Sequence, residues 1–360
     1  MRVIEVSAGP AAAFAGRLLS QLGGEVIAVR SPYGHPHFDS RSDLVDDETA
    51  LYCDQGKLIE HIDLRRRSGT DSVLRLIEGA DALVEDLGPG GLARLRLSYP
   101  RLRRVRPRIV VASISPFGWQ GPRAGWEASE LVVQAMAGVV HSTGWDAEAP
   151  LKLAGHPAHF VAGLHAATAI LAGVHGIASA QESGVHIDIS MEEAFVHHWT
   201  RHIAQWAYSG TGTRRERRTF GRQGFPHTVT AADGWLYILA LYAEWEELAF
   251  FLGLEPFITH EWTEPRVRAE RWPEIEPHFY ESIAARSKYD WFADAAERGY
   301  TFAPIESVLD LLDSPQFDAR RFFEQALVDG ESVPCPGLPF PWESVGRPDP
   351  RPADQRKDMS

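Results

Sequence analysis

The sequence predicts an α/β fold built around a mostly parallel sheet. Four short apolar segments have the composition of buried strands: Val3–Val6, Glu25–Val29, Ala82–Val84 and Ile109–Ile114. They alternate with segments of helical periodicity, and this alternation is typical of β-α-β units. The overall composition, with 44% hydrophobic and 24% charged residues over 360 positions, is that of an ordinary folded chain. Its length suggests about two domains.

The first predicted unit covers residues 2–32 and contains two strands around a helix at Ala11–Leu22. The turn after its first strand, Ser7–Pro10, invites comparison with the dinucleotide-binding pattern GxGxxG. That pattern needs several glycines for the tight turn and for close approach of a pyrophosphate, and this turn has only Gly9. The second strand also ends in Arg30 and not in an acid that would bind a ribose. A dehydrogenase is therefore the weaker hypothesis.

Later loops fall at the same edge of the predicted sheet. Ligands gather at the carboxyl ends of parallel strands, so we expect the loops after Val6, Val84 and Ile114 to lie near a binding site. Farther along, Asp233-Gly234 between alternating apolar runs is a strong hairpin signal, and amphipathic helices rich in tryptophan follow it. This change of pattern predicts a second structural unit from about residue 226.

Charge and cysteine content exclude several classes of protein. The net charge of −13 argues against a nucleic-acid-binding protein, which would carry a basic surface. The two cysteines, Cys53 and Cys335, are too few for a disulfide framework, which indicates reduced thiols in a cytoplasmic protein. No signal peptide is visible, and no uncharged apolar run approaches the roughly 20 residues of a membrane span. We therefore expect a cytoplasmic chain with no nucleic-acid or membrane partner.

The stretch Leu151–Ala172 combines a chain break with an unusually small-residue helix. The break is Gly155–Pro157, and proline is favoured in the first turn of a helix. His159 is therefore expected in that turn, near the positive end of the helix dipole, where anions bind. A helix faced with alanine and glycine also lets another backbone or a ligand approach closely. The alternative interpretation is a buried packing helix with a histidine near its start.

Short motifs occur in a fixed order over nearly the whole chain. They are Ala8–Pro10, Leu22–Gly23, Glu25–Ile27, Val84–Glu85, Pro89–Gly90, Ser113–Ser115, Phe117–Gly118, Gly121–Pro122, Gln134–Gly138, Asp188–Ser190, Ala232–Gly234, Ala303–Ile305 and Pro336–Phe340. In this order they resemble the family III CoA-transferases, the group of formyl-CoA transferase, carnitine CoA-transferase and α-methylacyl-CoA racemase. The shared order of the motifs carries the resemblance.

The resemblance implies a Rossmann-like parallel-sheet domain built from both ends of the chain, residues 1–200 and 315–360. It also implies a linker at 201–225 and a smaller α+β central domain at 226–314. Two such subunits interlock like chain links in this family, so we expect a dimer. The expected ligands are an acyl-CoA, with coenzyme A as substrate, and a small carboxylic acid.

The catalytic position of the family is altered in this sequence. In the transferases an aspartate at the start of the central helix attacks the acyl-CoA and then carries CoA as a thioester. Alignment on Ala162–Leu164 places His159 at that position. An imidazole can accept an acyl group, but it has no carbonyl carbon for the thioester. Ser129 occupies the position of the racemase histidine, whereas Glu130 matches a supporting acid of formyl-CoA transferase, so His159 and Glu130 are the predicted catalytic residues.

The CoA-binding pattern of the family is only partly present. Lys57 remains in the stretch that resembles the basic segment of the family, but Leu58 and Gly88 replace two arginines. The lost cations would have met phosphates through charge-assisted contacts. The resemblance implies ten contacts to CoA. Its phosphates are expected at Ser7, Ala8, Gly9, Pro10, Arg30 and Lys57, and its thiol end at Phe117 and Gly118; the other two contacts are Pro89 and Gly90.

Three hypotheses about function stay open. In the first, His159 and Glu130 perform altered acyl-CoA chemistry, such as acyl transfer, racemisation, isomerisation or a lyase reaction. In the second, the chain is an aspartate-free subunit that pairs with an aspartate-bearing paralogue in a heterodimer, as occurs in this family, and not with itself in a homodimer. In the third, it binds acyl-CoA without catalysis. The spacing of the remaining histidines predicts no metal site.

Overall fold

The computed structural model describes residues 1–31, 47–144, 148–180, 183–197, 200–212, 225–239, 243–328 and 331–340. The chain forms two compact units. The first comprises Met1–Gly144, Ala149–Arg215 and Arg320–Ser360, and the second comprises Trp145–Glu148 and Glu216–Ala319.

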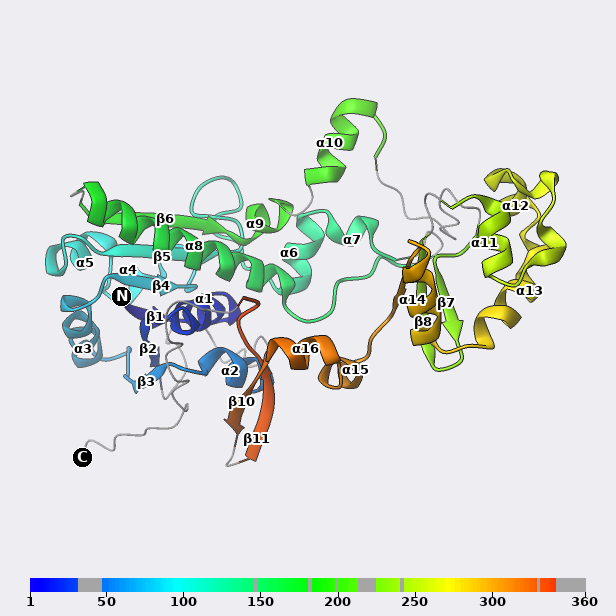
Figure 1. Ribbon diagram of the computed structural model, residues 1–360. Helices are drawn as coiled ribbons and strands as arrows, with labels where there is room; N and C mark the ends of the chain where they lie inside the picture. Colours follow the sequence, from blue (N-terminus) through cyan, green and yellow to red (C-terminus); the bar gives the residue numbers. More distant parts are fainter. Residues whose placement is uncertain are drawn as a thin grey trace. The chain divides into compact units, whose positions relative to one another are not determined.

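A six-stranded sheet forms the centre of the first unit (Figure 1). Its strands are β1 (Arg2–Val6), β2 (Glu25–Arg30), β3 (Leu58–His61), β4 (Ala82–Glu85), β5 (Val110–Ser115) and β6 (Val185–Ser190). The order is β3-β2-β1-β4-β5-β6, and each neighbouring pair is parallel. The predicted α/β class is thus confirmed. Strands β4 and β5 are buried along their whole length, which explains their nearly continuous apolar sequences.

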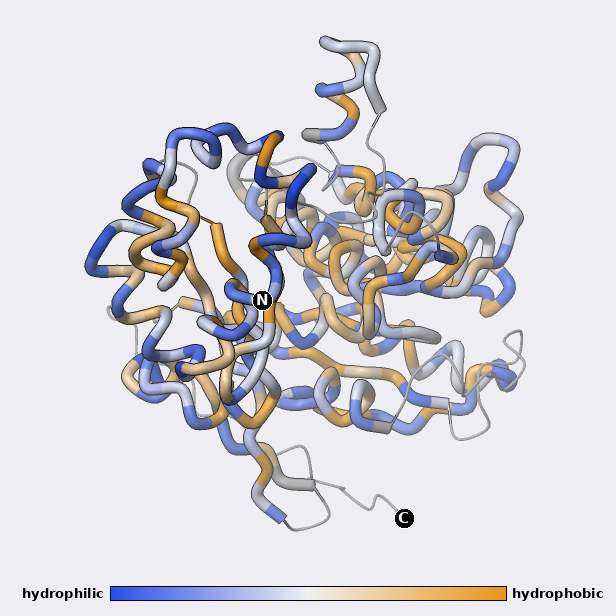
Figure 2. The backbone as a smooth tube through the Cα atoms, turned by 90° about the vertical axis from the view of Figure 1, so that its right-hand side faces the viewer, coloured by the Kyte–Doolittle hydropathy of each residue, from blue (hydrophilic) through white to orange (hydrophobic). Residues whose placement is uncertain are grey.

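Helices cover both faces of this sheet. The helices of the first unit are α1 (Pro10–Gln21), α2 (Asp47–Asp54), α3 (Arg67–Glu78), α4 (Gly91–Arg94), α5 (Tyr99–Val105), α6 (Glu130–Met136), α7 (Val139–Ser142), α8 (Pro157–Ala180), α9 (Met191–His197) and α10 (Thr200–Ser209). Helix α10 is largely exposed and does not cover the sheet. Val3 of β1 belongs to a buried cluster with residues of α1, α6, α8 and α9, while Ile4 and Val6 belong to another cluster with residues of α3, α4 and α5. Figure 2 shows hydrophobic backbone segments towards the inside and hydrophilic ones on the outer turns. The sheet is the middle of three layers.

The predicted linker at 201–225 is helical in its first part, which belongs to α10. Ile203 and Trp206 lie three residues apart there, so both fall on one helical face. Residues 213–224 of this predicted linker lie outside the described residues.

The second unit contains a three-stranded antiparallel sheet in the order β7-β8-β9. Its strands are β7 (Thr228–Ala231), β8 (Gly234–Leu239) and β9 (Thr301–Pro304), and the turn at Ala232–Asp233 forms the predicted hairpin. Its helices are α11 (Trp245–Phe251), η3 (Glu255–Phe257), η4 (His260–Trp262), α12 (Pro265–Glu270), α13 (Trp272–Ala284), α14 (Lys288–Glu297) and α15 (Val308–Leu312). Four buried tryptophans belong to its core: Trp245, Trp262, Trp272 and Trp291.

The chain then returns to the first unit. Helix α16 (Pro315–Arg320) spans the boundary and leads into an antiparallel pair, β10 (Phe323–Val328) and β11 (Glu331–Pro336). Arg17 of α1 contacts both strands, because its Nη2 lies 3.9 Å from Glu324 Oε2 and 3.5 Å from the Pro336 carbonyl oxygen. A single buried guanidinium therefore links this hairpin to the first helix of the chain.

Helix α8 packs closely against α1 because it carries small residues. A Cβ atom on Gly163 would lie 2.5 Å from the Ala11 carbonyl oxygen and 3.2 Å from the Ala15 amide nitrogen. By length and composition α8 is also long and apolar enough to cross a membrane, since Pro157–Ala178 has a mean hydropathy of 1.6 and 33% of it is buried in this chain. The expectation that no such segment exists is therefore wrong. Its histidines interrupt the apolar run without adding a fixed charge.

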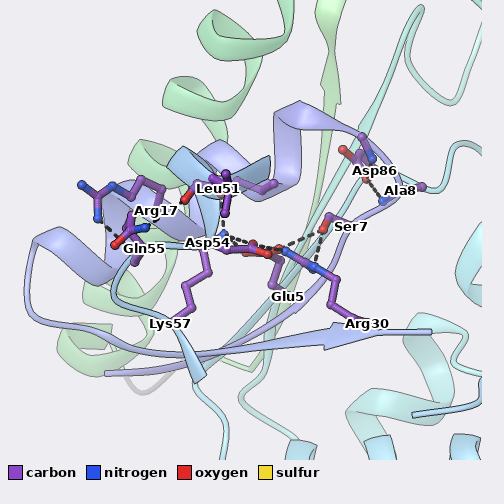
Figure 3. A network of polar contacts seen from close by, with 12 residues as sticks. Glu5, Ser7, Ala8, Arg17, Arg30, Leu51, Asp54, Gln55, Lys57 and Asp86 are labelled. Carbon is purple, nitrogen blue, oxygen red and sulfur yellow. Dashed lines mark hydrogen bonds and ion pairs between the residues drawn. The ribbon is translucent and has the colours of Figure 1, made fainter. Parts of the chain in front are cut away.

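A buried ion network fixes α1 on the sheet (Figure 3). The Glu5 carboxylate lies 2.6 Å from Lys57 Nζ and 2.9 Å from Arg30 Nη2, and it accepts a hydrogen bond of 2.8 Å from the Ser7 hydroxyl. Lys57 Nζ also donates to the Ala13 carbonyl oxygen of α1 at 2.8 Å. Burial alone would raise the pKa of Glu5, but Lys57 and Arg30 hold it below the ordinary value of 4.5.

Replacing Gly163 with alanine tests the contact between α1 and α8. Alanine favours a helix over glycine by about 1 kcal/mol, but overpacking against a backbone costs about 1–3 kcal/mol. We expect Gly163→Ala to lower the free energy of unfolding by about 1–2 kcal/mol in urea titrations. Gly176→Ala on the same helix is the matched control, because a Cβ there meets no atom within 4 Å. It should raise stability by about 0.5–1 kcal/mol; equal effects of the two changes would contradict this packing.

Replacing Lys57 with methionine tests the buried ion pair. The change leaves Glu5 buried with Arg30 as its remaining cation, and we expect a loss of about 3 kcal/mol, the lower end for a broken buried pair. Because the folded pKa of Glu5 is lowered, its ionisation stabilises the fold above pH 4.5 and this contribution is lost as the pH falls through the folded pKa. The difference between wild type and variant should therefore shrink in acid. A constant difference would show that charge is not its cause; adding Glu5→Gln should recover part of the loss.

Candidate active site at the start of helix α8

The strand order reverses between β1 and β4, so the loops after these two strands meet at the switch point of the sheet. Residues 7–9 follow β1 and lead into α1, while residues 86–90 follow β4 and lead into α4. Helix α8 lies against α1. Ligands of open α/β sheets bind at this edge, and most residues predicted to bind CoA lie here.

His159 and Glu130 form a buried pair in this region. His159 lies in the first turn of α8 and Glu130 in the first turn of α6, and each side chain is 9% exposed. Glu130 Oε2 lies 2.5 Å from His159 Nδ1 and accepts the His159 amide N–H at 3.2 Å. Glu130 Oε1 accepts the Ala158 amide N–H at 2.9 Å. One carboxylate thus caps α8 and orients the imidazole.

The charge of Glu130 decides which nitrogen of His159 holds a proton. Burial opposes ionisation of Glu130, but hydrogen bonds from His159, Ala158 and Gln134 bring its pKa below the ordinary value of 4.5. Glu130 is therefore ionised at neutral pH and can only accept, so Nδ1 of His159 must donate. Nε2 remains as the ring nitrogen for proton transfer or nucleophilic attack.

Gln134 holds Glu130 in place. Its side chain is fully buried, and its Nε2 donates to Glu130 Oε1 at 2.7 Å and to the Leu153 carbonyl oxygen at 3.2 Å. Its Oε1 accepts the Leu153 amide N–H at 2.8 Å. Gln134 thereby connects α6 to the segment that precedes α8. From the sequence it belonged only to a family motif, because a contact over nineteen residues has no local signal.

Asp86 is a site residue that sequence analysis missed. Its carboxylate comes directly after β4 and accepts the amide N–H groups of Ala8 at 2.6 Å, Gly9 at 3.2 Å and Ala12 at 3.0 Å. Burial raises the pKa of Asp86, although these amides and the nearby His159 oppose the rise. The amides of Ala8 and Gly9, predicted to face CoA phosphates, thus donate to a carboxylate of the chain itself. The sequence signal that could have identified Asp86 is its position as a polar residue directly after a buried strand.

The predicted cations lie together around Glu5, but they differ in access (Figure 3). Lys57 Nζ is fully buried and contacts Glu5 and Ala13, so a phosphate contact would require it to leave these partners. Arg30 donates to Ser7 and Asp54, and its side chain remains 24% exposed. Arg30 is therefore the better placed of the two cations for an anionic ligand.

The remaining predicted CoA contacts lie in two loops. Arg94 donates to the Pro89 carbonyl oxygen at 3.1 Å, and Gly90 adopts a φ of +74° as the N-cap of α4. Phe117 is nearly buried after β5. Gly118 has a φ of +77°, and a Cβ on it would contact Ser190 of β6 at 3.5 Å. Both loops follow neighbouring strands at the same edge of the sheet.

Comparison with known proteins identifies the family. The model of CoA-transferase family III matches residues 1–354. A succinyl-CoA:(R)-benzylsuccinate CoA-transferase subunit of Thauera aromatica is 27% identical over 99% of this chain and 92% of its own length. The succinate–glutarate CoA-transferase of Agrobacterium fabrum is 27% identical over 93% of this chain and 86% of its own.

Solved structures agree on the fold. A CAIB/BAIF family protein from Brucella suis superimposes with a TM-score of 0.83 at 24% identity, covering 96% of this chain and 92% of that one. A Mycobacterium tuberculosis protein gives a TM-score of 0.77 at 21% identity, covering 98% of this chain and 95% of that one. With motifs, fold and relatives in agreement over nearly its full length, the chain belongs to CoA-transferase family III.

Proposed function

We propose that this chain binds an acyl-CoA as one subunit of a CoA-transferase whose nucleophilic aspartate comes from a partner chain. The proposal rests on one observation: the position of the family's nucleophile, in the first turn of α8, holds His159, which is hydrogen-bonded to Glu130. Relatives named for transfer between acyl-CoA thioesters and succinate, glutarate or oxalate support the substrate class. A relative that is itself named as a subunit supports the need for a partner.

The chemistry of CoA transfer explains why this chain would need a partner with an aspartate. A carboxylate oxygen attacks the thioester carbon, the C–S bond breaks, and CoA leaves as a thiolate while an anhydride forms. The thiolate then attacks the carboxylate carbon of the enzyme, which releases the free acid and leaves an enzyme–CoA thioester. Nε2 of His159 can perform only the first of these substitutions, because an imidazole offers no carbonyl carbon to the returning thiolate. The second acid therefore has no activated CoA to take from this chain.

A second function is favoured by the hydrogen bond between Glu130 and His159. A base oriented by a carboxylate and free at Nε2 suits removal of a proton next to a thioester carbonyl. Under this alternative the chain isomerises, racemises or cleaves an acyl-CoA without covalent transfer. The two functions differ in what a carboxylate at position 159 would do, since it restores a nucleophile in one case and removes the oriented imidazole in the other.

Replacement of His159 by aspartate tests the transferase proposal. Wild-type chain alone should transfer no CoA from succinyl-CoA to glutarate or to other dicarboxylic acids, as followed by liquid chromatography. His159→Asp should gain measurable transfer and a CoA adduct in intact-protein mass spectra, because a carboxylate forms both intermediates. His159→Asn has the same shape without the nucleophile and should gain neither. A stoichiometric CoA thioester on the wild-type chain would contradict the proposal.

Replacement of His159 by alanine tests the acid–base alternative. Exchange of the α-hydrogens of succinyl-CoA in deuterated water should fall by about 10²–10⁴-fold, the usual contribution of a positioned base. His159→Asp should not restore the exchange. His175→Ala, an exposed position on the same helix, should leave it unchanged. If wild-type chain and His159→Ala exchange hydrogens at the same rate, His159 is not a base towards this substrate.

A further inference from the structure

We infer that Glu130, His156 and His159 form a binding site for a divalent transition-metal ion, with Zn²⁺ as the best chemical match. One ligand atom from each of the three residues lies within 4.8 Å of the other two. Two residues are buried and His156 is half-buried, so the cluster opens towards solvent through His156. This inference goes beyond the proposed transferase function and does not depend on it.

The donor set suits zinc. Two imidazoles and one glutamate are the protein ligands of many catalytic zinc sites, which keep a further position for water or substrate. Zinc bonds of about 2.0–2.2 Å place ligand atoms roughly 3–3.5 Å apart. The Glu130–His159 pair, now at 2.5 Å, must therefore open by about 0.5–1 Å, while the His156 ligand atom, within 4.8 Å of both, must approach them. His156 lies in the break before α8, outside the helix, and its side chain would move towards the Glu130–His159 pair to complete the site. The rings of His156 and His159 stand perpendicular with centroids 6.0 Å apart.

The hydrogen bond between Glu130 and His159 marks the place of the ion. Nδ1 of His159 lies 2.5 Å from Oε2 of Glu130 and donates a hydrogen bond to it. The ion takes the place of this proton, which is transferred through solvent to Nε2, so that the neutral imidazole and the carboxylate each supply one lone pair to the ion. Glu130 Oε1 keeps its bonds from Gln134 and Ala158, so the ligand stays oriented from behind.

Charge at the site balances two opposing effects. The positive end of the α8 dipole disfavours a cation in the first turn of the helix. The carboxylate of Glu130 accepts the amide N–H groups of Ala158 and His159 at the start of α8 and supplies a negative charge next to the ion. Gln134 holds this carboxylate through a hydrogen bond of 2.7 Å, so its negative charge stays next to the ion.

Metal binding by the full chain tests the inference. Purified protein is stripped with a chelator, and Zn²⁺ binding is measured by calorimetry while Co²⁺ serves as a spectroscopic probe. We expect one ion per chain and visible absorption typical of Co²⁺ with imidazole ligands. His156→Ala should weaken binding at least about tenfold, the loss that even outer-shell changes cause. His175→Ala lies on the same helix outside the cluster and should bind as wild type.

Two results of these binding measurements would exclude the metal site. Absence of stoichiometric Zn²⁺ binding, or equal affinity of wild type and His156→Ala, would overturn the inference. Circular dichroism establishes that the variants are folded, and His156→Gln provides a second variant of similar size with the same expected loss. Because binding is measured without acyl-CoA, a negative result leaves the transferase proposal standing, and failure of that proposal leaves this site untouched.

Discussion

The Glu130 carboxylate is the contact on which the candidate site depends. It accepts the amide N–H groups of Ala158 and His159, which α8 cannot satisfy internally, and the Nδ1–H of the same histidine. The start of the helix and the direction of the imidazole are therefore set by one group. Gln134 completes this arrangement because it fixes Glu130 from the other side and holds the backbone of Leu153.

A second carboxylate, that of Asp86, caps α1 as Glu130 caps α8. Asp86 lies at the end of β4, and the N-cap residue of α1, Gly9, has no side chain that could accept these hydrogen bonds. Both helices thus begin at a carboxylate supplied by a distant part of the chain. The dipoles of the two helices, which would attract an anionic ligand, are partly satisfied from within. The half-buried Arg30 and the exposed Arg94 consequently become important for any phosphate at this edge of the sheet.

The sequence predicts the scaffold better than the site. Strand alternation predicted the parallel sheet because buried strands must be apolar. Asp233-Gly234 predicted the hairpin, but the turn lies one residue earlier, at Ala232–Asp233, and Gly234 begins β8. Helix α8 was recognised by Pro157, but its membrane-like apolarity was not, because histidines broke the run. The partners of Lys57, Asp86 and His156 depend on contacts over long separations, for which local pattern carries no information. Family motifs identified Glu130 and His159, whereas their hydrogen bond required the fold.

The cap at the start of α8 separates helix formation from the side chain at position 159. Glu130 holds this turn through backbone amide groups, and every amino acid except proline provides such a group at position 159. The residue at this position can then change during evolution with little cost to folding, since the helix still begins at the same place. A gene copy can lose its nucleophile and keep its architecture. Such copies can persist as subunits that pair with the parental enzyme, or they can acquire a new reaction. Each variant along the way still folds.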